Sequence, residues 1–152
     1  MSVRPFAAAL ALLLVTGCGG ASAKKSSASP TPVVDAAAVA AITTTWEAFF
    51  NPAGGLDVHI ALLENGPAFR AELIAAAKDP AAANLSAKVT KVVVTGTTAA
   101  VTYDLLGKGG VALLPGAVGG AVKQGGAWKV SKLTYCQLVS LQNPSVKHPA
   151  CV

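Results

Sequence analysis

Residues 88–106, which read KVTKVVVTGTTAAVTYDLL, contain the pattern that decides the fold class. The first half is rich in Val and Thr, residue types that are enriched in β-strands. In the second half, apolar and polar side chains alternate with a period of two, which is typical of a strand with one buried face. The buried face is expected to carry Ala99, Val101, Tyr103 and Leu105, opposite Thr98, Thr102 and Asp104. Gly96-Thr97 separates the halves as a turn, so the stretch predicts an antiparallel hairpin.

The residues after this hairpin predict two further strands. The third strand is expected over residues 111–122, with a bend at Pro115-Gly116, and a turn follows at residues 124–126. The last strand is expected over residues 128–141. Its alternation changes phase at Ser131-Lys132, which favours a β-bulge at that point.

The residues before the hairpin predict three helices. The first follows Asp35, a residue type that caps helix N-termini, and its apolar side chains recur at helical spacing. This apolar face comprises Val39, Ile42, Trp46, Phe49 and Phe50. The second helix is expected to start at an Asp57 N-cap and to end at Asn65-Gly66, and the third to run from Pro67 to Asp79-Pro80. Helices followed by strands predict an α+β domain, with N-terminal helices packed on a curved four-stranded antiparallel sheet.

The N-terminus carries the features of a secretory signal peptide. Arg4 is followed by an apolar run over residues 6–15, which is shorter than the ~20 residues that a membrane-spanning helix needs. The next residues, Thr16-Gly17-Cys18, complete a pattern that resembles the lipobox of bacterial lipoproteins. In that family the cysteine thiol receives lipid, and the cysteine becomes the first residue after cleavage. The open alternative is an ordinary secreted protein that is cut near Ala21-Ser22-Ala23.

The chain accordingly divides into a signal peptide (1–17), a tether (18–34) that begins at lipidated Cys18, and a folded domain (35–152). Gly, Ser, Ala and Pro dominate the tether, and such residues cannot bury enough apolar surface to offset the entropy of ordering, so a flexible tether is expected. Two or more acyl chains hold a protein stably on a membrane. We therefore expect the protein on the extracytoplasmic face of the cell membrane, or secreted if the lipobox is not used.

The folded part contains two cysteines, Cys136 and Cys151. Export into an oxidising compartment favours a disulfide between them, since a redox-active pair normally has a Cys-x-x-Cys spacing that is absent here. Closing this loop is worth roughly 3 kcal/mol if the bond acts by restricting the unfolded chain. The bond is expected to hold the C-terminal tail on the predicted last strand.

The distribution of charge and the absence of known motifs argue against several classes of function. The chain carries a net charge of +5, but its lysines are scattered and Arg70 is the only arginine after the signal peptide, which disfavours nucleic-acid binding. His59 and His148 are far apart, so no metal site is expected. The sequence also has no nucleotide-binding loop and no nucleophile-elbow motif. We therefore expect no cofactor and no nucleic-acid partner.

Several segments together resemble a known family of actinobacterial antigens. They are residues 46–50, 62–66 with Phe69, 89–92, 99–105, 125–132 and 135–138. Residues 35–141 are similar to the C-terminal domain of the low-molecular-weight secreted antigens of mycobacteria and related actinobacteria, the MTB-twelve-like domain. A Trp-x-Val strand after Gly-Gly also recurs in cone-shaped domains of the nuclear-transport-factor-two and SnoaL-like type. The resemblance implies a cone fold, an exported or envelope location and no established enzymatic activity.

Four side chains are candidates for a pocket: Asp57, His59, Tyr103 and Trp46. In enzymes of the cone fold, an Asp/His or Tyr/Asp pair inside the cone performs acid–base chemistry, but here Asp57 is explained as an N-cap and the aromatic residues as core. No catalytic residue is therefore expected. The sequence predicts a cell-envelope lipoprotein with a non-enzymatic binding or interaction domain. The expected partners are the membrane, through the lipid anchor, and a small apolar ligand or an envelope protein. The alternative is a small cone-fold enzyme or a carrier of an apolar ligand.

Overall fold

The computed structural model describes residues 35–142, 144 and 149–151. The predicted signal peptide, the tether and Cys18 lie outside the described residues. Along the chain, helices come first, a four-stranded sheet follows, and one further helix comes after the sheet. The helices are α1 (Ala36–Phe49), α2 (Leu56–Leu62), α3 (Arg70–Ala77) and α4 (Lys132–Gln142). The strands are β1 (Ser86–Thr95), β2 (Thr98–Leu106), β3 (Ala112–Gln124) and β4 (Ala127–Val130). Short 3-10 helices are η1 (Pro52–Gly54), η2 (Gly66–Phe69), η3 (Ala82–Asn84), η4 (Lys108–Gly110) and η5 (Pro149–Cys151).

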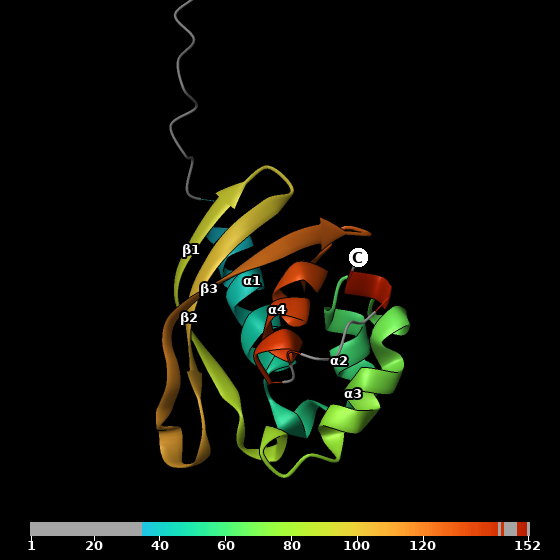
Figure 1. Cartoon of the computed structure of the whole chain (residues 1–152). Helices are drawn as coiled ribbons and strands as arrows, with labels where there is room; N and C mark the ends of the chain where they lie inside the picture. The colour runs from blue at the N-terminus through green and yellow to red at the C-terminus, as the bar shows by residue number, and fades with distance from the viewer. Residues whose placement is uncertain (1–34, 143, 145–148, 152) are drawn as a thin grey trace, which may run out of the picture.

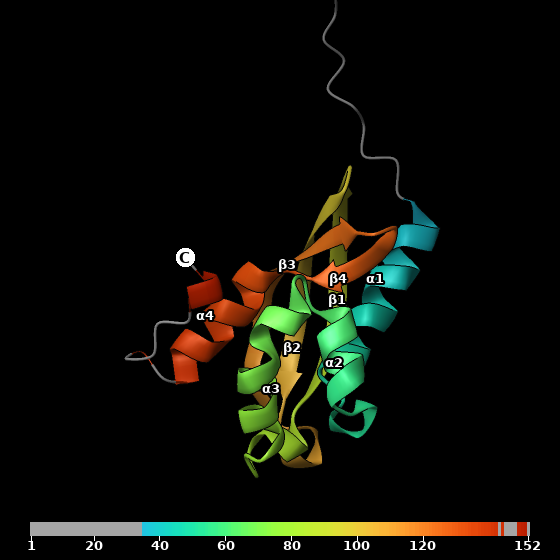
Figure 2. The same cartoon turned by 90° about the vertical axis from the view of Figure 1, so that its right-hand side faces the viewer.

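The four strands form one antiparallel sheet in the order β1-β2-β3-β4. The predicted hairpin is confirmed, because β1 and β2 pair as far as Thr95 and Thr98, and Gly96 in the turn has a φ of +61°. The predicted bend in the third strand is also present: the β2–β3 register shifts after Tyr103, and Gly116 has a φ of +64°. In Figure 1, β1, β2 and the first part of β3 lie to the left of the helices, and the end of β3 crosses above α4. In Figure 2, α2 and α3 stand in front of β2. The α+β arrangement predicted from the sequence is therefore confirmed.

The first helix packs on the sheet through the face that its sequence predicts. It begins at the expected cap, where the Ala38 N–H donates a hydrogen bond to Asp35 Oδ1 at 3.0 Å. The helix lies against β1 and β4 and buries Ile42, Trp46 and Phe49. Burying a large apolar side chain of this kind stabilises the folded state by about 1.5–3 kcal/mol. Helix α1 thus supplies much of the core.

Trp46 packs directly on the backbone of β3. A Cβ atom on Gly119 would lie 2.8 Å from Cη2 of the Trp46 indole and 2.7 Å from Cγ2 of Thr134. Both neighbours are buried, so neither can move aside without disturbing the core. The missing side chain at position 119 is what lets α1, β3 and α4 approach one another.

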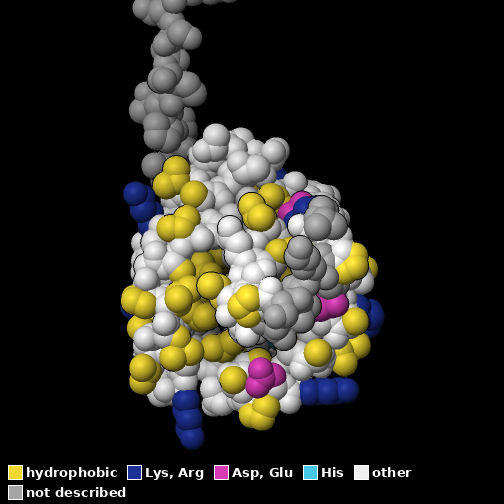
Figure 3. Space-filling model, in the orientation of Figure 1, with side chains coloured by type: hydrophobic (Ala, Val, Ile, Leu, Met, Phe, Trp, Pro, Cys, Tyr) yellow, Lys and Arg dark blue, Asp and Glu magenta, His cyan; other side chains and the backbone are white. Residues whose placement is uncertain are grey.

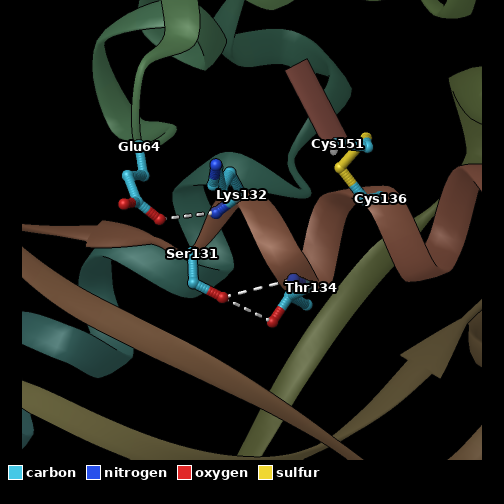
Figure 4. Close-up of a disulfide and its surroundings, with 6 residues drawn as sticks. All are labelled: Glu64, Ser131, Lys132, Thr134, Cys136 and Cys151. Atoms are coloured by element: carbon cyan, nitrogen blue, oxygen red, sulfur yellow. Dashed lines mark hydrogen bonds between the residues drawn. A yellow bond between two sulfur atoms is a disulfide. The ribbon is translucent and has the colours of Figure 1, made fainter. Parts of the chain in front are cut away.

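The predicted last strand is wrong beyond its first residues. The strand β4 ends at Val130, and α4 follows. Ser131 is a helix cap rather than part of a bulge, since its Oγ accepts the backbone N–H of Thr134 at 3.2 Å. The Lys132 N–H donates to Oε2 of Glu64, in the loop after α2, at 2.9 Å (Figure 4). The first N–H groups of a helix have no partner within it, so these two acceptors stabilise a helix start at this point.

Asp57 is not the N-cap of α2, which corrects a second expectation. The helix begins at Leu56 after Gly55, whose φ is +77°, and no side chain caps it. Asp57 lies in the first turn, where its negative charge interacts favourably with the partial positive charge of the helix N-terminus. Its carboxylate lies 3.9 Å from Nη2 of Arg70. The third helix is found where it was predicted, although the 3-10 turn η2 precedes it.

Gly119→Ala is expected to lower the free energy of unfolding by about 2 kcal/mol, because an added methyl group overpacks a rigid part of the core. Gly54→Ala is the matched control, since a Cβ atom there has its nearest neighbour, His59 Nε2, at an ordinary 3.4 Å. Urea unfolding of both variants measures the difference. A Gly119→Ala protein as stable as the Gly54→Ala protein would contradict the close approach of Trp46 to β3.

Candidate functional site

A cavity of about 490 Å³ lies between the C-terminal end of α1, the start of α2, α3, η3 and α4. Its volume falls in the range of about 300–1,000 Å³ that is typical of small-molecule sites. Apolar side chains form most of the wall: Phe49, Phe50, Leu56, Leu73, Leu85, Leu138 and Val139, with alanines at positions 75–77, 82 and 83. The alanines leave the space open because their methyl groups fill less of it than larger side chains would.

Tyr135 is the buried polar side chain of this wall. Its ring meets Phe69 and Phe49 edge to face, with centroid distances of 5.2 and 6.1 Å. Burial and, secondarily, the negative charge of Glu72 raise the pKa of Tyr135 to about 12. Its hydroxyl is therefore protonated and neutral near pH 7, and it can donate or accept a hydrogen bond.

The other polar side chains of the cavity are half-buried or exposed. Nε2 of His59 lies 3.0 Å from the carbonyl oxygen of Asn51, and because a carbonyl only accepts, this nitrogen carries the proton and donates. Oδ1 of Asp79 accepts the backbone N–H of Ala81 at 2.9 Å. Glu72 and Asp79 are the two acidic groups of the wall, and no described Lys or Arg lines the cavity.

Only one of the four candidate pocket residues, His59, lines this cavity. Trp46 and Tyr103 lie together in the core with their ring centroids 5.2 Å apart. Nε1 of Trp46 is buried there, without a hydrogen-bond partner among the described residues. The side chain of Asp57 is 92% exposed. The structure therefore brings Trp46 and Tyr103 together and places Asp57 in solvent, away from them.

Tyr103 instead borders a smaller hollow of about 200 Å³ between β3 and α4. Leu114, Val118, Leu138 and Leu141 contribute to its wall. Figure 3 shows apolar side chains gathered over this part of the surface, where Val118 and Leu141 are both well exposed. Because Leu138 borders both hollows, α4 forms the partition between them.

The wall that α4 contributes was not predicted from the sequence, because the pattern over residues 128–141 favoured a strand. A signal was present: Tyr135, Leu138, Val139 and Gln142 are spaced as i, i+3, i+4 and i+7, the spacing of one helix face. The alternation that favoured a strand corresponds to strand structure only as far as Val130, where β4 ends.

The predicted disulfide is confirmed between Cys136 and Cys151, whose Cα atoms lie 5.8 Å apart (Figure 4). Cys136 lies on α4, so the bond joins η5 to a helix and not to the last strand, as was expected. Because Cys136 directly follows Tyr135, the bond also ties down the segment that forms the cavity wall.

No helix in the described part of the chain is both long enough and apolar enough to cross a membrane. The same residues contain no group of three or more His, Cys, Asp or Glu side chains that could hold a metal ion.

Residues 35–145 match the family model described as low molecular weight antigen MTB12, C-terminal domain. The chain belongs to this family. The matched range begins at the cap of α1 and includes the whole sheet and α4, so it covers the elements that build the cavity. No curated protein and no solved structure matches the chain. The resemblance seen in the sequence is thereby confirmed, and the folded part is a secreted-antigen-like domain.

Glu72→Gln is expected to lower the pKa of Tyr135 from about 12 toward 10.0, without reaching it, because the carboxylate is the second cause of the shift and burial remains. In a Tyr103→Phe background Tyr135 is the only tyrosine, so ultraviolet absorbance of the phenolate reports its titration. Asp57→Asn removes an exposed carboxylate and is the control. No shift in Glu72→Gln, or an equal shift in Asp57→Asn, would contradict the assignment.

The same raised pKa has a consequence for stability. The folded protein holds the Tyr135 proton more tightly than the unfolded chain does, since its pKa of about 12 exceeds 10.0. The contribution of this group is therefore complete below pH 10 and is lost as the pH rises toward 12.

Proposed function

We propose that this chain is a lipid-anchored protein of the cell envelope whose domain binds a small apolar molecule. The observation that carries the proposal is the cavity of about 490 Å³ with its largely apolar wall. Moving apolar surface from water into such a site is favourable by roughly 25 cal/mol per Å². The few polar groups of the wall would orient the bound molecule.

Two features support binding without catalysis. Nε2 of His59 is engaged with the carbonyl of Asn51, and Asp57 points into solvent, so these two side chains do not form an acid–base pair. The hydroxyl of Tyr135, with a pKa of about 12, is poorly matched to proton transfer near pH 7. These features disfavour the small cone-fold enzyme that the sequence left open.

The proposed anchor is Cys18, which lies outside the described residues. Its support is the lipobox-like ending Val15-Thr16-Gly17-Cys18 after a short apolar run, together with membership of an antigen family. The disulfide between Cys136 and Cys151 adds support, because such bonds persist in oxidising compartments outside the cytoplasm.

Cys18→Ser is expected to release the protein from the membrane, because the sulfur atom that would carry the acyl chains is gone. Detergent-phase partitioning and the intact mass of the exported protein measure this. The unchanged chain should enter the detergent phase with the added mass of its lipid. Ser22→Ala is the control, since it alters the same segment and the alternative cleavage site but keeps the thiol. Unchanged partitioning and mass in Cys18→Ser would sink the anchoring proposal.

Ala76→Phe is expected to weaken ligand binding about tenfold or more, because position 76 lies in the cavity wall and a phenyl ring fills part of the space. Decanol, which is apolar and uncharged, is the probe. It is titrated calorimetrically into the oxidised full-length chain carrying Cys18→Ser, which has no lipid of its own. Ala71→Phe, at an exposed position of the same helix outside the cavity, is the matched control. Equal decanol affinity in the two variants would show that the cavity is not the site.

A further inference from the structure

The edge of β3 that faces α4 is only partly covered. Strand β4 pairs with residues 121–124 of β3, so residues 112–119 have a single neighbour, β2, among the described strands. Helix α4 meets this edge at Gly120, whose N–H is bound by Oγ1 of Thr134. Next to this contact, the smaller hollow of about 200 Å³ lies between the strand and the helix. A strand edge without a neighbour presents backbone groups that a further strand can bind.

Val118 presents a backbone donor and a backbone acceptor on this edge. The N–H and the C=O of Gly120 both point away from β2, because they bond to Thr134 and to the N–H of Ser131. Backbone directions alternate along a strand, and the β2–β3 register is regular between these positions, so the N–H and C=O of Val118 point the same way. Since β4 does not extend this far, Val118 can pair with one more strand.

The helix side of the hollow completes a site for an extended backbone. Gln137 of α4 adds a side-chain amide, which both donates and accepts hydrogen bonds. Most of the remaining wall is apolar and includes Leu138 and Leu141 of the helix and Leu114 of the strand. Polar groups on two sides of an apolar hollow fit a peptide whose backbone forms hydrogen bonds and whose side chain enters the hollow.

Exposed apolar side chains are concentrated on the same two elements. Among the described residues, the five most exposed large apolar side chains lie on β3, directly before it or on α4, and no other is more than 41% exposed. These five are Val111, Leu113, Val118, Leu133 and Leu141. Figure 3 shows the apolar side chains gathered over this part of the surface. Apolar side chains that gather in this way mark a site of interaction.

Size and charge indicate the kind of partner. At about 3.3 Å per residue, residues 112–119 span roughly 26 Å, and a strip as wide as a helix, roughly 10 Å, offers about 260 Å². A stable interface between two folded proteins needs about 800 Å² on each side, so this strip is too small to hold a second copy of the chain. No charged side chain of the described residues lines the hollow, and none occurs in residues 112–119. The strip fits one short, uncharged peptide segment.

We propose that an extended, uncharged segment of another protein adds to the free edge of β3 as a short strand. Its backbone exchanges hydrogen bonds with the N–H and C=O of Val118, and one apolar side chain lies in the hollow against Leu141. The added strand ends before Pro115, which has no N–H, since the N–H of Gly116 is already bound by Oδ1 of Asp104 at 2.7 Å. This inference is independent of the ligand proposed for the larger cavity.

A synthetic peptide tests whether the edge accepts a strand. The probe is acetyl-Thr-Val-Thr-Leu-Thr-amide, which is uncharged and composed of residues that suit a strand, and the protein is the oxidised full-length chain carrying Cys18→Ser. At saturation, the peptide should slow hydrogen exchange of the Val118 amide about tenfold or more. The Gly119 amide, which points toward β2, is the internal reference and should not change. The same peptide with every amide nitrogen methylated lacks the donors and should bind at least about tenfold less tightly.

Leu141→Lys should weaken binding of the probe about tenfold or more, because it removes an exposed apolar side chain from the wall of the hollow. Leu133→Lys is the matched control, since Leu133 lies on the same helix at a similar exposure but does not line the hollow. Equal binding in the two variants, equal binding of the methylated peptide, or no binding up to about 1 mM would each overturn the inference.

Two further measurements separate the other places and occupants. If Ala76→Phe weakens binding of the probe and Leu141→Lys does not, the peptide lies in the larger cavity and the inference fails. Sedimentation velocity of the chain without peptide reports self-association. A monomer is expected, and a dimer that Leu141→Lys dissociates would show that a second copy of the chain covers this edge, which would also overturn the inference.

Discussion

One serine turns the chain from the sheet into the helix on which the cavity depends. The backbone N–H of Ser131 donates to the carbonyl of Gly120 at 2.8 Å. This hydrogen bond follows the Ala121–Val130 pair, at which the register of β3 with β4 ends. Oγ of Ser131 accepts the N–H of Thr134, which begins α4. Oγ1 of Thr134 in turn accepts the N–H of Gly120 at 2.7 Å, so the helix start is fixed to the neighbouring strand. Tyr135 and Cys136 lie where they do because the chain leaves the sheet at this residue.

The strands and the first helix follow from local patterns, and α4 does not. The alternation in β2 and the helical spacing in α1 each reflect burial of one face, which the sequence records directly. The start of α4 depends on partners that are distant in sequence: Glu64, whose carboxylate accepts the Lys132 N–H from 68 residues away, and Gly120 of β3. Residues 132–142 also mix β-branched and aromatic residues with polar ones, so local propensity alone does not decide their structure.

The candidate site could not be predicted from the sequence, for a different physical reason. Its space is created by alanines such as Ala76 and Ala82, and in a chain so rich in alanine these positions look like any others. The conspicuous residues, Trp46 and Tyr103, fill the core instead, where large aromatic side chains bury the most surface. Sequence patterns report which faces are apolar, whereas a cavity arises where facing apolar side chains fail to meet.

The disulfide bears both on the cellular location of the protein and on the shape of its cavity. Helix α4 is held at its N-terminal end by Ser131 and Thr134, and one turn later Cys136 ties it to η5. Between these attachments lies Tyr135, and beyond them Leu138 and Gln142 continue the wall toward the C-terminal end of the helix. In a reducing compartment the tie to η5 would be lost, and α4 would be held by the contacts of Ser131 and Thr134 and by the packing of Tyr135 on Phe69 and Phe49. A disulfide that restrains this wall persists in the oxidising surroundings that an exported protein meets, so the fold agrees with the proposed location.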